Sequence, residues 1–241
     1  MAAPADAVWR ALRDPAELPR WFGWDAEGLA EEIEDIFVTH AVAADAERIL
    51  RFDDIPDRFE LEPRSADETV LRLVGARLEP DDAYDGMHEG WLSFIAQLRF
   101  ALERHPGKDR RTLYLTGQTP SASGDGVMAA LGLPDLQTGG SAGDSYEVRG
   151  DDGEVALAGE VWARSPRQTA ITVGGGTGLL VATQLPPDVK PPYGGATAII
   201  TSYGLSDDEF QRVRHSWTGW WQTRFSAATA TVFPESAAAT A

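Results

Sequence analysis

The segment from Ser206 to Phe225, SDDEFQRVRHSWTGWWQTRF, constrains the fold more than any other stretch of the chain. Ser206 precedes Glu209 by three residues, which is the spacing of a capping box, where each side chain accepts a hydrogen bond from a backbone N–H at the start of a helix. Apolar residues then recur at intervals of three or four, as on one face of an amphipathic helix. Three tryptophans on this face require a broad cover, which we predict to be a curved antiparallel sheet. The face consists of Phe210, Val213, Trp217, Trp220, Trp221 and Phe225.

An earlier segment repeats this pattern. With one residue of slack, LEPDDAYDGMHEGWLSFIAQLRF at 78–100 aligns with the chain from Leu205 onward, and both carry an Asp-Asp pair, a central Trp and a closing Arg-Phe. A weaker match places VWRALRDP at 8–15 on VMAALGLP at 127–134. Two matches in the same order predict an internal duplication; the alternative is a chance likeness between two amphipathic helices. We therefore expect one domain at 1–107, a second at 108–233 and a disordered tail at 234–241.

The overall composition restricts the classes of function. A net charge of −17 disfavours binding to nucleic-acid phosphates and to anionic lipid surfaces. The absence of cysteine excludes disulfides, thiolate catalysis and thiolate metal sites. No apolar run reaches the ~18 residues of a membrane span, and the N-terminus lacks a secretory signal pattern. With 43% hydrophobic residues, the chain is expected to be a folded, acidic, cytoplasmic protein.

Between the two long helices and before the first, the hydrophobic pattern has a period of two, which is typical of strands. The N-terminal region instead predicts a helix that begins near Pro4 and a second, short helix at Ala16–Phe22. After a linker at 105–111, another helix is expected at Val127–Leu133. The expected strands are Glu32–Thr39, Glu47–Phe52, Arg58–Pro63, Thr69–Leu78, Thr112–Thr116, Ser145–Arg149, Glu154–Ala163, Gln168–Val173, Gly178–Gln184 and Ala196–Ser202.

This order of short helices, antiparallel strands and one long closing helix is that of the helix-grip fold, in which a curved sheet wraps around the helix. The N-terminal residues resemble a known family. APADAVWRALRDP at 3–15, continuing to RWF at 20–22, is similar to the opening of the SRPBCC (START/birch-pollen-allergen-like) superfamily. Gly90-Trp91, followed by Leu98 and Leu102, resembles the closing helix of its branch of activators of the heat-shock-90 ATPase. The resemblance implies an α+β, helix-grip fold in two tandem copies.

The resemblance is specific over 3–22 and 78–104 and weaker over 110–241. This sequence also departs from the family pattern at one point. Members of the family carry a β-strand just before the Ala-Pro-Ala motif, whereas only Met1-Ala2 precede that motif here. Because this strand lies inside the sheet, its loss would leave a row of backbone groups unpaired. We therefore expect either that the true start lies upstream or that another segment occupies the position of the strand.

No motif in the chain identifies a catalytic or metal centre. The run Gly174-Gly175-Gly176-Thr177-Gly178 lacks the Lys and the following helix of a phosphate-binding loop, so a hairpin turn is the better interpretation. The four histidines show no helical pairing with one another or with an HExxH-type Glu, which argues against zinc. Ser121 and Ser123 lack the strand–Ser–helix context of a hydrolase. Carboxylate doublets such as Asp151-Asp152 are typical of turns. We expect no catalytic residue, metal or cofactor.

The aromatic faces of the two long helices are the remaining candidates for a site. In a helix-grip fold this face forms the core, and it also lines the cavity between helix and sheet, where apolar ligands are held. Two histidines lie one turn before the tryptophans and could face the same cavity; the competing interpretation is that they lie on the surface. The cavity-lining candidates are Trp91, Phe94, Leu98, Trp217, Trp220, Trp221, His88 and His215.

Three functions from different classes follow. The first is a module that binds a small hydrophobic molecule and has no intrinsic catalysis. The second, allowed by the superfamily resemblance, is an enzyme of the polyketide cyclase or aromatase kind, in which His88, Arg99, His215 or Arg224 would orient an enol for proton transfer. The third is a co-chaperone-like module that binds a protein partner. Fold alone does not choose among them.

Overall fold

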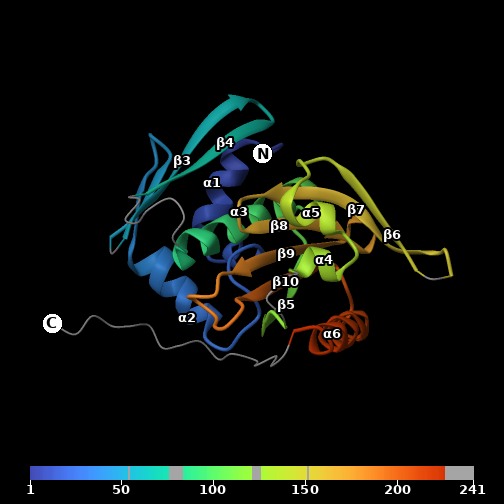
Figure 1. Cartoon of the computed structure of the whole chain (residues 1–241). Helices are drawn as coiled ribbons and strands as arrows, with labels where there is room; N and C mark the ends of the chain where they lie inside the picture. The colour runs from blue at the N-terminus through green and yellow to red at the C-terminus, as the bar shows by residue number, and fades with distance from the viewer. Residues whose placement is uncertain (54, 76–83, 121–125, 151, 226–241) are drawn as a thin grey trace.

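The computed structural model describes residues 1–53, 55–75, 84–120, 126–150 and 152–225 and shows an α+β protein with two antiparallel sheets (Figure 1). The smaller sheet has the strand order β1-β2-β3-β4, and the larger has the order β5-β10-β9-β8-β7-β6. In the larger sheet β5, the first strand along the chain, therefore pairs with β10, the last along the chain. The strands are β1 (Ala41–Ala44), β2 (Ile49–Phe52), β3 (Ile55–Ser65), β4 (Glu68–Val74), β5 (Arg110–Gln118), β6 (Ser145–Arg149), β7 (Val155–Arg164), β8 (Gln168–Val173), β9 (Gly178–Leu185) and β10 (Gly195–Tyr203).

Two long helices and several short ones complete the fold. None of the described helices is long and apolar enough to cross a membrane. The expected disordered tail lies outside the described residues, as does Asp81-Asp82, the Asp-Asp pair of the matched segment at 78–100. The helices are α1 (Ala5–Arg13), the 3₁₀ turn η1 (Leu18–Arg20), α2 (Leu29–Ile33), the π-helix η2 (Glu34–Thr39), α3 (Gly86–Arg104), α4 (Val127–Ala130), α5 (Pro134–Thr138), the 3₁₀ turn η3 (Gly174–Gly176) and α6 (Asp207–Gln222).

One predicted strand is wrong: the segment 32–39 is helical, in α2 and η2. Its apolar residues alternate over a few positions, which suggested a strand. Ile33 and Phe37, however, are four residues apart and are the two that are buried, as on one face of a helix. Val38, the residue after Phe37, is 45% exposed.

The cap of α6 is confirmed. The Ser206 Oγ accepts a hydrogen bond from the Glu209 backbone N–H, and the Glu209 carboxylate accepts one from the Ser206 backbone N–H at 2.8 Å. The cap of α3 is different. Asp85 accepts hydrogen bonds from the backbone N–H groups of Met87 and His88, so the helix begins at Gly86. The first six positions of the matched segment 78–100 lie outside the described residues, and internal duplication stays a prediction.

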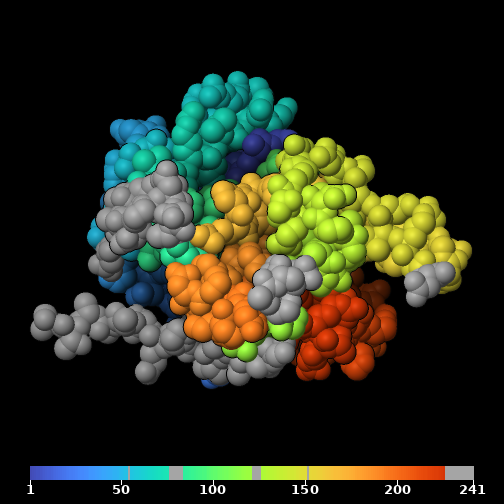
Figure 2. Space-filling view, viewed as in Figure 1, coloured from blue at the N-terminus to red at the C-terminus, as the bar shows by residue number. Residues whose placement is uncertain are grey.

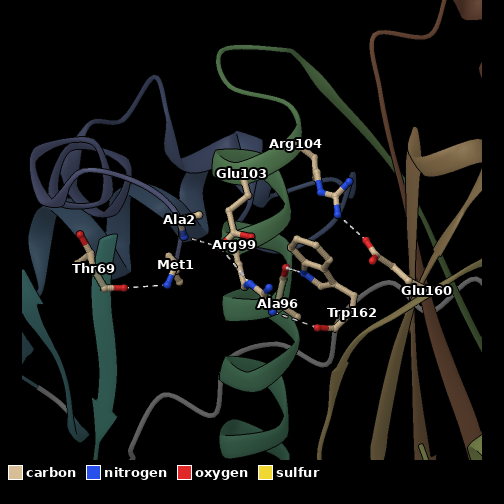
Figure 3. Close-up of polar contacts among 9 residues, drawn as sticks. All are labelled: Met1, Ala2, Thr69, Ala96, Arg99, Glu103, Arg104, Glu160 and Trp162. Atoms are coloured by element: carbon tan, nitrogen blue, oxygen red, sulfur yellow. Dashed lines mark hydrogen bonds and ion pairs between the residues drawn. The ribbon is translucent and has the colours of Figure 1, made fainter. Parts of the chain in front are cut away.

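Helix α3 joins the two sheets (Figure 1), because its buried residues share one hydrophobic core with the smaller sheet, with α1 and with one face of the larger sheet. The Trp162 Nε1 in β7 donates a hydrogen bond to the Ala96 carbonyl at 3.0 Å. Arg99 donates to the Trp162 carbonyl at 3.1 Å and its guanidinium lies 4.1 Å from the centre of the Trp162 ring (Figure 3). This core crosses the expected boundary at 107, so the division into two domains stays a prediction.

The N-terminus pairs with the edge of β4 (Figure 3). The Met1 ammonium donates to the Thr69 carbonyl at 2.8 Å, and the Thr69 N–H donates to the Met1 carbonyl at 3.0 Å. The Ala2 N–H donates to the Glu103 carboxylate on α3 at 2.7 Å. Met1 thus pairs with β4 at the edge of the smaller sheet, and the strand expected before the Ala-Pro-Ala motif stays a prediction.

Helix α6 lies at the surface of the molecule, beside β5 (Figures 1 and 2). Phe210 near its start and Trp221 near its end are buried, at 5% and 0% exposure. The middle of the apolar face is only partly buried, at Val213, Trp217 and Trp220. The expectation that a curved sheet covers the whole face is therefore only partly met. The larger sheet buries its other face against α3.

Candidate functional site

The eight predicted site residues do not come together. Trp91 is buried among aromatic rings of the first half of the chain: its ring stacks on Phe52 at 5.3 Å and meets the edge of Phe59 at 5.1 Å. These rings fill the space between α3 and the smaller sheet as a packed core. Leu98 and Trp221 are also buried, Phe94, Trp217 and Trp220 are partly buried, and His88 and His215 are exposed.

A hollow of about 80 Å³ lies elsewhere, between the short helices α4 and α5 and the strands β8 and β9. We call it the β8 hollow. None of the eight predicted residues is in its wall. Seven of its eleven lining residues are polar, so it differs from the apolar cavity that the sequence predicts. The wall is formed by Val127, Met128, Gln137, Ser165, Pro166, Arg167, Gln168, Thr169, Ala182, Thr183 and Gln184.

Gln137 gives the wall an unsatisfied acceptor. Its Oε1 is buried and has no hydrogen-bond partner among the described residues. Gly126 allows the amides to gather here, because a Cβ at that position would lie 2.5 Å from both the Gln137 and the Gln184 side chains. A buried polar atom without a partner costs roughly 1–3 kcal/mol, so a bound water or ligand group that donates to Gln137 would stabilise the site.

Gln168 forms the opposite part of the wall and is 6% exposed. Its amide contacts α3 behind the hollow: the Ser93 hydroxyl donates to Gln168 Oε1 at 3.0 Å, and Gln168 Nε2 donates to the Glu89 carboxylate at 2.7 Å. Burial raises the pKa of Glu89 above its ordinary value, and the hydrogen bond from Gln168 partly opposes this shift. Among the described residues Glu89 is the only Asp or Glu that is buried, and it contacts the wall of the β8 hollow through Gln168 without lining it.

Glu89, Ser93 and Gln97 are buried polar residues on α3, four positions apart, and His105, eight residues after Gln97, is a buried polar residue just beyond the end of the helix. Each of these side chains contacts the larger sheet or its loops. The Thr201 hydroxyl donates to Gln97 Oε1 at 2.7 Å, and His105 Nε2 lies 3.2 Å from the Gly176 carbonyl oxygen. Burial lowers the pKa of His105. The spacing of these residues is present in the sequence, but prediction from apolar faces does not select polar residues.

The proposed catalytic histidines and arginines are also dispersed. Arg99 binds Glu103 and Trp162 in the joint between α3 and β7. Arg224 follows the end of α6, where it donates to the Trp220 carbonyl at 3.1 Å.

A second, open hollow at α2 and η2 is acidic, with Glu31, Glu34 and Asp35 in its wall. Among the described residues no group of three or more His, Cys, Asp or Glu side chains could hold a metal ion.

Comparison with known proteins adds little. No protein-family model matches the chain, and no curated protein matches it. Among solved structures, the DynU16 protein of the dynemicin biosynthetic locus is 15% identical with a TM-score of 0.26, and 92% of each chain is covered. The di-domain ARO/CYC StfQ from the steffimycin biosynthetic pathway is 12% identical with a TM-score of 0.27, covering 91% of this chain and 92% of its own. Likeness at this level carries no weight for fold or function, and the SRPBCC resemblance stays a prediction.

Proposed function

We propose that this protein binds a small molecule in the β8 hollow and does not act on it chemically. The observation that carries the proposal is the Gln137 Oε1, a buried acceptor without a described partner in the wall of a hollow. Native proteins pair the great majority of such atoms with protein, water or ligand. A ligand group that donates a hydrogen bond would complete the site.

The dimensions of the hollow restrict the ligand. Its volume of about 80 Å³ is well below the ~300 Å³ at which pockets for drug-sized molecules begin. Gln137, Thr183 and Gln184 offer hydrogen bonds, whereas Met128 and Ala182 offer an apolar edge. We therefore propose a compact ligand, or one compact end of a ligand, with an N–H or O–H donor and a small apolar part. The hollow at α2 and η2 is larger, at about 380 Å³, but its wall is acidic and therefore does not suit the larger hydrophobic molecule expected from the sequence.

The cyclase-type enzyme is the second candidate. It is favoured by Glu89, whose carboxyl is buried directly behind Gln168 and whose pKa is raised, as a general acid requires. It is disfavoured by His88 and His215, which are exposed and lie away from the hollow. The protein-interaction module keeps one supporting feature, the partly exposed Trp217 and Trp220 on α6.

The test is a screen of fragments by ligand-observed NMR against the wild type and three variants. Gln137→Leu removes the free acceptor and is expected to weaken a bound donor fragment roughly 2- to 12-fold, the loss of one hydrogen bond. Ala182→Leu fills the hollow and is expected to abolish binding. Gln211→Leu, an exposed glutamine on α6, is the matched control and should bind as the wild type does.

Two results would overturn the proposal. One is that no fragment binds the wild type; the other is that binding survives both Gln137→Leu and Ala182→Leu. Conversion of a bound fragment to product, lost in Glu89→Gln, would replace the binding module by the enzyme. His88→Ala and His215→Ala are expected to leave binding unchanged, because both side chains are exposed outside the hollow.

A further inference from the structure

Strand β6 forms one edge of the larger sheet, and the β6–β7 hairpin projects from the body of the molecule (Figures 1 and 2). The strand is nevertheless held firmly in the sheet. Tyr146 reaches across β7, and its hydroxyl donates to the Thr172 carbonyl of β8 at 2.6 Å. Gly159 of β7 leaves room for this contact, because a Cβ at that position would lie 3.0 Å from the Tyr146 ring. The edge that β6 presents to solvent is therefore fixed in place.

Two hydrogen bonds at the ends of β6 show which of its backbone groups face β7. The Val161 N–H donates to the Asp144 carbonyl at 2.8 Å, and the Gly150 N–H donates to the Glu154 carbonyl at 2.9 Å. Along an antiparallel pair, successive residues alternate between facing the partner strand and facing away from it. The backbone groups at the odd-numbered positions of β6 therefore face outward. These positions are Ser145, Glu147 and Arg149.

The outward backbone groups form an unpaired edge. Outside the hairpin, no described residue forms a hydrogen bond with them. Such a row of free N–H and C=O groups is a template for another strand. The side chains of Glu147 and Arg149 are exposed beside it and form an ion pair at 2.6 Å. With one charge of each sign, β6 is neutral within a chain of net charge −17, so a second copy of the chain is not repelled at this edge.

We propose that β6 pairs with β6 of a second copy of this chain, as antiparallel strands related by a twofold axis at Val148. The axis must pass through a residue, because only outward-facing positions can hydrogen-bond across the pair. An axis at Glu147 or at Arg149 would place a charge opposite its own copy. An axis at Tyr146 would pair Glu147 with Ser145. The axis at Val148 alone places Glu147 opposite Arg149 of the second copy, and it does so twice.

This register also suits the residue on the axis. The two Val148 side chains would form a pair whose backbone groups face away from the partner strand, with Cα atoms ~4.5 Å apart and side chains in contact. Apolar pairs and opposite-charge pairs across strands stabilise a sheet, whereas like charges directly opposite destabilise it. Two six-stranded sheets would continue into each other, and the free edge of each would be covered.

The experiment measures the dimer Kd of the full chain by sedimentation velocity over a range of protein concentrations. The buffer contains ~0.15 M salt, where a Debye length of about 8 Å screens the repulsion between two acidic chains. A reversible dimer is expected. Glu147→Arg turns two opposite-charge pairs into two like-charge pairs and should raise Kd roughly 10- to 100-fold. Combining it with Arg149→Glu restores both pairs and should return Kd to about the wild-type value.

Glu62→Arg is the matched control. Like Glu147, Glu62 is exposed on a strand and pairs with an arginine two residues further on, Arg64, at 3.0 Å. It lies on β3, however, which has β2 on one side and β4 on the other and no free edge. The variant should keep the wild-type Kd. Circular dichroism establishes that each variant is folded.

The position of the axis can be tested directly, because the chain has no cysteine. Val148→Cys places the only thiol of each copy on the axis. The expected Cα separation of ~4.5 Å lies within the ~4.4–6.8 Å range of disulfides. Mild oxidation should therefore link the two copies, as a non-reducing gel would show. Val189→Cys, at an exposed position between β9 and β10, should remain unlinked.

The proposal is overturned if the wild type is monomeric at every concentration, or if its dimer Kd is unchanged in a folded Glu147→Arg protein. An axis at Val148 is overturned if the double reversal does not restore the dimer, or if Val148→Cys is linked no better than Val189→Cys. No residue of β6 lines the β8 hollow, so this experiment and the fragment screen can fail independently.

Discussion

Replacing Trp221 by alanine tests how α6 is attached to the sheet. The side chain is fully buried, its Nε1 donates to the Thr116 carbonyl at 3.2 Å, and its ring centre lies 4.4 Å from that of Phe225. Burying a tryptophan removes about 150–250 Å² from water, worth roughly 4–6 kcal/mol at ~25 cal/mol per Å² as an upper bound. Measured losses for such truncations are about 3–5 kcal/mol. We expect a loss of that size in the free energy of unfolding.

Trp217→Ala is the matched comparison, because it changes the same residue type one turn earlier on the same helix. Trp217 is only partly buried, so its truncation should cost no more than about 2 kcal/mol. Urea denaturation followed by far-UV circular dichroism, with the slope m compared between variants, measures both losses. Equal losses would refute the placement of α6 at the edge of the sheet and would support a sheet that covers its whole apolar face, as the sequence predicts.

Three further predictions concern packing and pH. Gly117→Ala should lower the free energy of unfolding by about 1–3 kcal/mol, because the new Cβ would lie 2.6 Å from Phe225 Cβ. Gly219→Ala, with open space around it, should raise the free energy of unfolding by up to about 1 kcal/mol. Equal effects in urea denaturation would contradict this. The pKa of His105 is lowered in the folded protein, so the unfolded state binds its proton more tightly. The free energy of unfolding should therefore fall as pH drops below about 6.5, and it should fall less steeply in His105→Gln. Parallel pH profiles of the two proteins would exclude this role. Glu89 has a raised pKa, so wild-type stability should decline as pH rises above about 4.5, and Glu89→Gln should remove that decline; an unchanged slope would argue against it.

What could be predicted from the sequence was local. The capping box at Ser206 is found because its two partners are three residues apart and need no other part of the chain. Strands β8 and β9 are found within a residue of their predicted bounds, because their apolar runs end at turn residues. The segment 32–39 was misassigned because a short apolar run fits a strand or a helix, and burial of Ile33 and Phe37 together depends on the packing around them.

The site could not be predicted in this way. Gln137 and Gln168 come from separate elements, and glutamine has no spacing that indicates a site, so their meeting follows from the packing of α5 against β8. The predicted tryptophans were sought on two apolar faces, in the belief that each helix is gripped by its own sheet. Trp91 and Trp221 are buried as expected, but as packed core, and no described hollow has them in its wall.

The polar residues on α3 follow from the position of that helix between two sheets. A helix with one sheet needs one apolar face, and its other face can be charged. Helix α3 is covered on both sides, so Glu89, Ser93 and Gln97 are buried and must find partners on the larger sheet. Apolar contact is non-directional and would allow the sheets to slide past each other. The hydrogen bonds from the Thr201 hydroxyl to Gln97 and from the Gln168 amide to Glu89 require one register, and that register brings the wall of the β8 hollow into place.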